Sequence, residues 1–424
     1  MTGRAGRTLR VLSPLLPQGH AALRWVFLGA ALCGCFRQAG AGKLDAPRPL
    51  SVRWRAELRD ALESRWKPEE AATPVVAGDL VIVGVRTRGV FALDRRSGQV
   101  RWHALPSGAD GPALFLPDPP GKEEAGLAAR TDRMTWLGRL LGAPARPPAA
   151  ARGTLYLGSN DGCLYALDAA TGRVRWRFPK DSTMKGTMEH APIHRDGVLY
   201  FTTSENRLYA VTAVEGRWKW QYERESPEHF TIRGFAGPAL VGKNVCTGFS
   251  DGYVACVAAE SGEVQWARSL AAVSDQFVDV DSTPVFHQGL LFAASYSGGV
   301  YALGPNDGAV VWRFHAEGAG GIIPADERLF FSTGTQGLHA IDLKGRLVWR
   351  QAVESAGAFG TPVLGPEGSL VVGSADGGLF VVARDSGHLR ALFAPGRGFS
   401  APPDVEGHDV YALSNGGSLY ALEL

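Results

Sequence analysis

A unit that recurs along most of the chain limits its possible folds more than any other feature. Each copy has two apolar strands around a Gly/Asp/Asn turn, then a Gly turn and a third strand that carries an aromatic residue. The clearest copy runs from Gly153 through Asp168 to Trp176, and further copies begin near residues 78, 197, 242, 289, 327 and 368. The alternation of apolar and polar residues predicts half-buried strands, and the glycines supply the positive φ that tight turns need.

The spacing of the copies predicts how many strands each one contains. Successive tryptophans lie 44, 46 and 46 residues apart in the central copies and 37 apart in the shortest (Trp176, Trp220, Trp266, Trp312 and Trp349). This spacing suits a four-stranded propeller blade of about 40–50 residues. We therefore expect the Trp and Tyr residues at repeat positions to pack between blades rather than to hold a cofactor.

The two ends of the repeat array predict a closed ring. An eighth copy, Gly407 to Leu424, stops before its aromatic strand, and the segment Ser51 to Leu58, which contains Trp54, has the pattern of the missing strand. Pairing the two would remove exposed sheet edges. Although a length of 424 residues suggests two or three domains at about 150 residues each, the repeat predicts one all-β domain, an eight-bladed β-propeller, over residues 51–424.

One segment interrupts the period. Trp102 and Trp176 are 74 residues apart, and the excess lies near Ala104–Ala150, which is rich in proline at both ends. Within it, Thr131–Leu141 has the pattern of a short capped helix with one apolar face. This insertion is either a partner-binding or lid element, or a surface insertion without a function of its own.

The N-terminus has the layout of an export signal. Arginines from Arg4 to Arg24 precede a short apolar run, Trp25–Leu32, and small residues follow. The run Leu32-Cys-Gly-Cys35 resembles a bacterial lipobox, in which the acylated cysteine becomes the new N-terminus. We predict a signal peptide over residues 1–34, lipidation of Cys35 and a flexible tether over residues 35–50, with Cys33 as the alternative lipidation site. The competing interpretation is a tail without a targeting role.

Charge and hydropathy exclude two classes of protein. Removing the four arginines of residues 1–34 from the 44 basic residues leaves 40 against 42 acidic residues, a net charge of −2. Such a balance offers no electrostatic basis for binding nucleic acid. No apolar run after residue 35 approaches the roughly 20 residues of a membrane span, which excludes a polytopic membrane protein.

Cysteines and catalytic-looking motifs point to structure rather than chemistry. Cys246 and Cys256 are predicted on the two strands of one hairpin, where they either form a disulfide or are two small buried residues. The Gly-x-Ser-x-Gly stretch Gly248–Gly252 occupies a hairpin turn of the repeat instead of a strand-to-helix elbow. No Cys/His spacing typical of a metal site occurs, so we expect no metal, no cofactor and no enzymatic activity.

The repeat itself carries a resemblance to a known family. Leu164-Tyr-Ala-Leu-Asp-x-x-Thr-Gly-x-x-x-Trp176 resembles the PQQ-like propeller repeat, over nearly all of residues 51–424. That repeat occurs in quinoprotein dehydrogenases and in BamB-type lipoproteins of the outer-membrane β-barrel assembly machinery. The size, the lipobox and the eight blades are similar to the BamB-type family, whereas dehydrogenases of this fold are longer and use a neighbouring cysteine pair with calcium.

Two stretches make the resemblance more specific. Phe230–Pro238 looks like the family's connection into the next blade, and Asp279–Pro284 closely resembles its Asp-Val-Asp-Thr-Thr-Pro loop. The resemblance implies that these loops face the POTRA domains of the barrel-forming partner, BamA. The implied contacts are Phe230 and Ile232 as apolar groups, Arg233 as the cationic anchor, and Asp279 and Asp281 as its acidic companions. The alternative is that the two aspartates cap their own turn and pair with Arg233 internally.

The resemblance implies a non-catalytic scaffold on the periplasmic face of the outer membrane, anchored by lipid. Its expected partners are a BamA-type protein and unfolded outer membrane proteins, held by edge pairing or apolar loops. The alternatives are a general protein-interaction propeller of the envelope and a PQQ-dependent dehydrogenase-like enzyme. Because one fold serves many functions, the repeat by itself does not choose among them.

Overall fold

The computed structural model divides the chain into two compact units, Met1–Cys35 and Phe36–Leu424. The structure describes residues 47–59, 70–105, 107–109, 111–119, 151–225, 236–271, 278–334, 336–352 and 357–424. The predicted signal peptide, Cys33, Cys35 and the predicted helix Thr131–Leu141 therefore lie outside the described residues. No helix that could span a membrane occurs in the described part of the chain.

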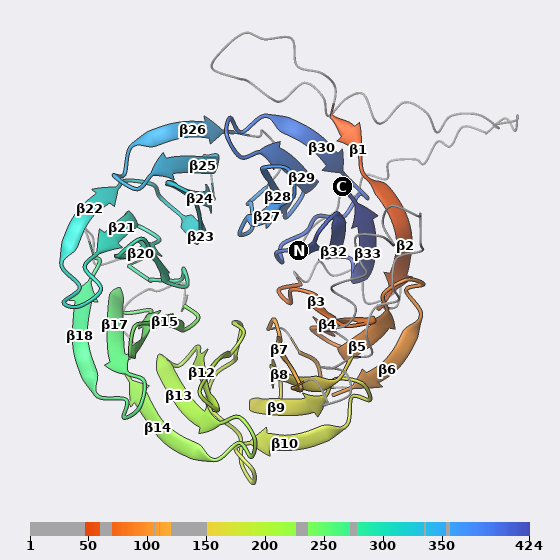
Figure 1. Cartoon of the computed structure of the whole chain (residues 1–424), viewed down its shortest axis with the longest axis horizontal. Helices are drawn as coiled ribbons and strands as arrows, with labels where there is room; N and C mark the ends of the chain where they lie inside the picture. Colours follow the sequence, from red (N-terminus) through yellow and green to blue (C-terminus); the bar gives the residue numbers. More distant parts are fainter. Residues whose placement is uncertain are drawn as a thin grey trace, which may run out of the picture. The chain divides into compact units, whose positions relative to one another are not determined.

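The unit Phe36–Leu424 is an eight-bladed β-propeller, as predicted from the repeat (Figure 1). Every regular element in the described ranges is a β-strand. Seven sheets have four strands and one has five, and the order within each follows the chain except where the ring closes.

The first four blades, each given from its innermost to its outermost strand, are as follows. Blade 1 has β3 (Val75–Ala77), β4 (Leu80–Val85), β5 (Gly89–Asp94) and β6 (Val100–Ala104); blade 2 has β7 (Leu114–Pro117), β8 (Gly153–Ser159), β9 (Cys163–Asp168) and β10 (Val174–Phe178); blade 3 has β11 (Ile193–Arg195), β12 (Val198–Thr203), β13 (Arg207–Thr212) and β14 (Trp218–Glu223); blade 4 has β15 (Ala239–Val241), β16 (Asn244–Gly248), β17 (Tyr253–Ala258) and β18 (Val264–Ser269).

The other four blades complete the ring. Blade 5 has β19 (Val285–His287), β20 (Leu290–Ser295), β21 (Gly299–Leu303) and β22 (Val310–Phe314); blade 6 has β23 (Ala319–Ala325), β24 (Arg328–Thr333), β25 (Gly337–Asp342) and β26 (Leu347–Gln351); blade 7 has β27 (Val363–Gly365), β28 (Ser369–Ser374), β29 (Gly378–Ala383), β30 (Leu389–Phe393) and, outside it, β1 (Arg48–Pro49); blade 8 has β31 (Asp404–Glu406), β32 (Asp409–Leu413), β33 (Ser418–Glu423) and β2 (Ser51–Glu57).

The ring closes between the two ends of the array. β2 is antiparallel to β33, with Ser51 opposite Glu423 and Glu57 opposite Ser418, so the predicted N-terminal strand completes blade 8. β1 pairs in parallel with β30 and adds a fifth strand to blade 7. The last residues of the predicted tether, Arg48–Pro49, therefore already lie on the propeller, and Leu50 between β1 and β2 is buried.

The predicted insertion lies inside a blade rather than between two blades. β7 falls within the segment Ala104–Ala150 but is the innermost strand of blade 2, where Pro117 pairs with Gly153. The extra residues therefore connect β7 to β8. In the other blades this connection is a tight turn of two or three residues, such as Asp196–Gly197 in blade 3.

A tryptophan of the outermost strand joins each of seven blades to the next one. Each indole N–H donates a hydrogen bond of 2.9–3.1 Å to a backbone carbonyl in the following blade; the donors are Trp54, Trp102, Trp176, Trp220, Trp266, Trp312 and Trp349. A glycine of that blade lies against the indole ring, as Gly172 does against Trp102, where a Cβ would come within 2.6 Å. The aromatic residues of the repeat thus pack between blades, as expected.

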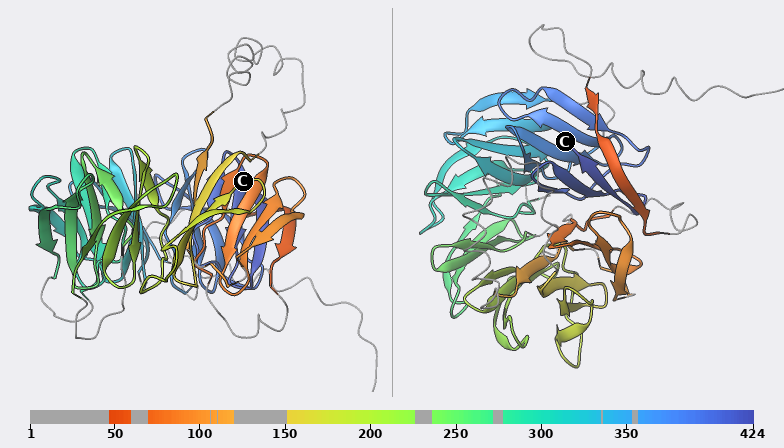
Figure 2. Two further views of the ribbon diagram at one scale, coloured as in Figure 1. Left: turned by 90° about the horizontal axis from the view of Figure 1, so that it is seen from below. Right: turned by 45° about the vertical axis from the view of Figure 1, so that its right-hand side comes forward.

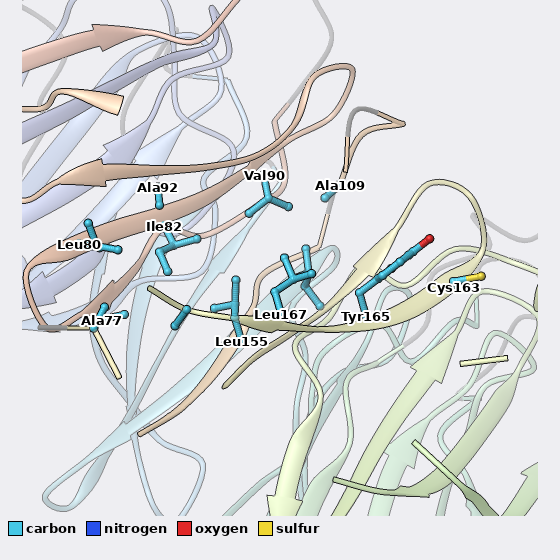
Figure 3. Packing of buried hydrophobic residues seen from close by; sticks show 13 residues of the cluster. Ala77, Leu80, Ile82, Val90, Ala92, Ala109, Leu155, Cys163, Tyr165 and Leu167 are labelled. Atoms are coloured by element: carbon cyan, nitrogen blue, oxygen red, sulfur yellow. The ribbon is translucent and has the colours of Figure 1, made fainter. Parts of the chain in front are cut away.

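Apolar side chains fill the space between neighbouring sheets. Figure 3 shows the cluster between blades 1 and 2, where Ile82, Val90 and Ala92 of one sheet face Leu155 and Leu167 of the next. Period-two alternation directs successive side chains of a strand to opposite faces, so every central strand contributes to two such clusters. This explains why β4 is buried along its whole length.

Blade 4 contains a disulfide where the neighbouring blades pair an aromatic residue with an alanine. Cys246 lies directly opposite Cys256 on β16 and β17, and the two are bonded, with Cα atoms 4.0 Å apart. In the neighbouring blades the corresponding pairs are an aromatic residue and alanine, Tyr200 with Ala210 and Phe292 with Ala302. Of the two alternatives left open by the sequence, the structure has the disulfide, beneath the indole of Trp266.

Candidate functional site

The strand order places the connections of the propeller on two opposite faces. One face carries the loops that lead from the outermost strand of a blade to the innermost strand of the next, together with the turns between the two central strands. The edge-on view in Figure 2 shows the strands running between these two faces. Both stretches of the predicted interface belong to blade-to-blade loops, β14 to β15 and β18 to β19, and so share a face.

The structure describes only part of the predicted interface. Phe230, Ile232 and Arg233 lie outside the described residues, whereas Asp279 and Asp281 are described. The described ends of the two loops are nevertheless tied together, because the backbone N–H of Gly237 donates to Oγ1 of Thr283 over 3.0 Å. The two predicted stretches are therefore anchored to each other at their bases.

The central turn of blade 4 holds the second loop in place. The N–H of Val280 donates to the carbonyl of Phe249 over 3.1 Å, and the N–H of Leu270 donates to that of Gly252 over 2.8 Å. Gly248 packs so closely on Val280 that a Cβ at position 248 would lie 2.3 Å from that side chain. The Gly-x-Ser-x-Gly stretch thus serves as the support for the neighbouring loop.

Ser250 within that stretch has a structural partner. Its N–H and Oγ both bond Oδ1 of Asn206, over 3.0 and 3.1 Å, and the Nδ2 of Asn206 donates to Ser250 Oγ over 2.8 Å. The residue is buried in a turn between two strands, as the repeat predicts. Within the described residues, no three His, Cys, Asp or Glu side chains gather as metal ligands would.

The two aspartates of the second loop form an acidic pair, of which Asp279 is buried and Asp281 is half-buried. Asp279 is fully buried, and its backbone carbonyl accepts the N–H of Tyr296 over 3.0 Å. Asp281 follows two residues later, and its Oδ1 is buried without a hydrogen-bond partner among the described residues. Burial raises the pKa of the Asp281 carboxyl to about 7, and the nearby charge of Asp279 adds to this, although backbone N–H groups of Asp281 and Ser282 oppose it.

Because the pKa of Asp281 is raised, the charged form of this carboxyl is unfavourable in the folded loop. A carboxyl with a pKa near 7 when folded and 3.8 when unfolded destabilises the folded chain increasingly as the pH rises from about 4 to about 7. A cation placed against Oδ1 would lower that pKa and remove the cost. The acidic pair is thus suited to receive a cationic group, from this chain or from a partner.

An arginine that the sequence analysis did not single out lies where β14 ends and the first loop begins. The guanidinium of Arg224 pairs with Asp251 over 2.6 Å and lies 4.0 Å from the ring centre of Tyr253. Both partners belong to the turn and strand of blade 4. The repeat could have indicated Asp251, because it occupies a recurrent turn position, but nothing in the spacing points to Arg224.

The segment between β7 and β8 belongs to the opposite face. The chain leaves β7 at Asp118 and re-enters before β8 at Arg152, at the end of blade 2 away from the two loops. The described ends of the β7–β8 segment therefore lie on the face opposite to Asp279 and Asp281.

Comparison with known proteins identifies the family. The family model described as outer membrane protein assembly factor BamB matches residues 124–344, 297–390 and 338–424. The BamB protein of Salmonella typhimurium is 32% identical over 279 residues, which cover 64% of this chain and 70% of that protein. The BamB protein of Legionella pneumophila is 29% identical over 199 residues, 46% of this chain, and the match spans about half (52%) of its length.

Solved structures agree on the fold. BamB from Moraxella catarrhalis superimposes with a TM-score of 0.65 at 18% identity, covering 88% of this chain and all of that one. Quinohemoprotein alcohol dehydrogenase from Comamonas testosteroni gives 0.59 at 16% identity, covering 88% and 76%. At these sequence identities, the superpositions show only that the chain has the propeller fold. Because the family model matches well over half of the sequence, the chain belongs to the BamB family of outer membrane protein assembly factors.

Proposed function

We propose that this protein is a non-catalytic, lipid-anchored scaffold of the outer-membrane β-barrel assembly machinery. It docks on the POTRA domains of a BamA-type protein, at the periplasmic face of the outer membrane, and aids the folding and insertion of outer membrane proteins. Membership of the BamB family supports the assembly role. The observation that carries the docking site is the acidic pair Asp279 and Asp281, held beside the base of the loop that contains Arg233.

The proposed interface combines apolar and charged groups on one face of the ring. Phe230 and Ile232 would contribute apolar contacts, and Arg233 would act as the anchor because a guanidinium pairs bidentately and is weakly hydrated. Asp281 would then neutralise either Arg233 or a cation of the partner. The hydrogen bond between Gly237 and Thr283 holds the described bases of the two loops together, which would lower the entropy cost of binding.

Binding of the unit Phe36–Leu424 to the POTRA segment of its own BamA tests the proposal. We expect Arg233→Glu and Asp281→Arg each to weaken binding by at least about tenfold, as removal of a buried charged contact costs about 2–5 kcal/mol. Glu260→Arg is the matched control for Asp281→Arg, because it makes the same charge change at an exposed turn on the opposite face. Binding that is equally insensitive to all three variants would remove the interface from these loops, and no binding by the wild type would contradict the scaffold role.

The lipid anchor has a separate test. We expect the full chain, expressed in a Gram-negative host, to incorporate labelled palmitate and to sediment with the outer membrane. Cys35→Ser should abolish the incorporation, because the acylated residue is lost, whereas Cys33→Ser should leave it unchanged. The reverse pattern would assign lipidation to Cys33, and incorporation in both variants would contradict the lipobox.

A further inference from the structure

Among the described residues, the most exposed large apolar side chain lies on the outer rim of blade 3. Val214 is 82% exposed in the turn between β13 and β14, and Trp218, the first residue of β14, is 58% exposed. The turn position of Val214 is occupied by Glu260 in blade 4 and Asn306 in blade 5, and Trp218 stands where those blades have valine. Blade 3 therefore presents a larger apolar surface at this turn than blades 4 and 5 do.

A third apolar residue joins this surface from the adjacent blade. The indole N–H of Trp176 donates to the carbonyl of Ala213 over 3.0 Å, and Gly216 lies against the same ring. Val174, two residues before Trp176 on β10, is 51% exposed. β10 and β14 are neighbours at the rim in Figure 1. We call Val174, Val214 and Trp218 the blade 2–3 rim.

Cationic side chains alternate with these apolar residues. Arg173 and Arg175 flank Val174, and Arg217 and Lys219 flank Trp218. Arg175 is paired with Asp168 and Arg217 with Glu215, each over 2.8 Å. In the described part of the chain Arg173 and Lys219 form no ion pair, and both are exposed, so the rim carries a net charge of about +2. The corresponding turn of blade 4 has Glu260 and Glu263 instead.

We propose that the blade 2–3 rim is a membrane-contacting surface that binds anionic phospholipid. An exposed tryptophan with aliphatic neighbours partitions into the headgroup region of a bilayer, and lysine and arginine beside it are attracted to anionic headgroups. The apolar groups lie on a projecting turn, which suits insertion into a lipid surface, whereas residues that anchor protein partners concentrate in packed pockets. Lipid contact by side chains and acylation together provide the two signals that stable membrane anchoring needs.

This inference rests on the proposed function in one respect, since the lipid anchor would hold the propeller beside a bilayer. It adds an orientation. The rim lies at the turns that share the face of the β7–β8 segment, so blades 2 and 3 would point toward the membrane. The loops that carry Arg233 and Asp281 would then open away from it, toward the periplasm.

Vesicle sedimentation with the unlipidated unit Phe36–Leu424, which is compact by itself, tests the proposal. Vesicles of phosphatidylethanolamine with one quarter phosphatidylglycerol are compared with neutral phosphatidylcholine vesicles. We expect binding to the anionic vesicles only, weakened at least tenfold by Val214→Ser with Trp218→Ser and, independently, by Arg173→Glu with Lys219→Glu. Val310→Ser with Val311→Ser is the matched control, because it removes two valines from blade 5 that are 48% and 57% exposed.

Each outcome decides for or against the rim. Tenfold weakening by both rim variants, with the control within twofold of wild type and binding reduced by salt, supports it. Absence of wild-type binding, equal binding to neutral vesicles, or equal weakening by the control overturns it. Loss of POTRA binding in the rim variants with vesicle binding intact would assign the rim to a protein partner. If the wild type binds vesicles through the rim but not POTRA domains, the docking proposal fails and this inference stands.

Discussion

At the residue scale, His339 is a titratable side chain at a buried position of the repeat that is aromatic in most other blades. The other blades have Phe91, Tyr165, Tyr209, Tyr301, Phe380 or Tyr420 at this position of the third strand, and only Ala255 in blade 4 is not aromatic. His339 is buried and stacks on Phe331 with ring centres 5.1 Å apart. Burial lowers its pKa from 6.5 to about 4, and the charge of Arg350 acts in the same direction.

The histidine should therefore make the fold sensitive to mild acid. Between pH 6.5 and about 4, His339 is protonated in the unfolded chain but neutral in the folded one. Its contribution to the free energy of unfolding therefore falls as the pH falls through this range. Protonation of Asp281 stabilises both proteins over this range, so the effect of His339 appears as a difference between them: from pH 7.5 to 4.5 we expect the free energy of unfolding of the wild type in urea to fall by about 2 kcal/mol relative to that of His339→Tyr. The variant restores the residue of the other blades, so it should fold. An identical loss in both proteins would show that His339 does not carry the effect.

At the element scale, the contact between a tryptophan and a glycine fixes each blade against the next. A Cβ at Gly262 would lie 2.7 Å from the Trp220 ring, and the residue has a φ of +76°. Gly242 has a φ of +57°, but nothing lies within 4 Å of its Cβ position, so it is a control for backbone strain alone. We expect Gly242→Ala to cost about 1 kcal/mol and Gly262→Ala about 1–3 kcal/mol more in urea unfolding. Equal losses would mean that the indole moves aside freely.

At the scale of the whole molecule, a buried ion pair lies where the chain passes from the N-terminal strand of blade 8 into blade 1. Arg59 follows β2 and Glu70 precedes β3; their side chains are buried and in contact, with Nη2 and Oε1 2.5 Å apart. Glu70 Oε2 also accepts the N–H of Arg86 in blade 1, and its own N–H donates to Asn415 Oδ1 in blade 8. The pair and its two backbone contacts therefore hold blade 8 against blade 1, at the two ends of the connection from β2 to β3.

Breaking this pair should destabilise the closed ring more than removing it entirely. Arg59→Met leaves a buried carboxylate without its cation, which typically costs about 3–5 kcal/mol. The double variant with Glu70→Gln should recover at least half of that loss, because no charge remains to be desolvated. Thermal unfolding of both proteins measures the difference. If the double variant is no more stable than the single one, the pair does not act as a charge pair.

Less of the candidate site than of the fold could be predicted from the sequence. Motif resemblance selected the stretches around Arg233 and Asp281, and the structure ties the bases of their loops through Gly237 and Thr283. The burial of Asp281 Oδ1 and the ion pair between Arg224 of blade 3 and Asp251 of blade 4 both depend on how the blades pack. Periodicity describes neighbours along the chain, so it carries no information on such contacts.

The sequence by itself determined the blade count, the closure by the strand that contains Trp54 and the packing role of the tryptophans. These follow from period and pattern, because each blade is a local unit that repeats every 40–50 residues or so. Only the tertiary structure decided that β7 belongs to blade 2, that Cys246 faces Cys256, and that Val214, Trp218 and Val174 are exposed on adjoining blades. The innermost strands are three to seven residues long, too short for a periodic signal, and cross-blade contacts depend on how the sheets turn about a common ring.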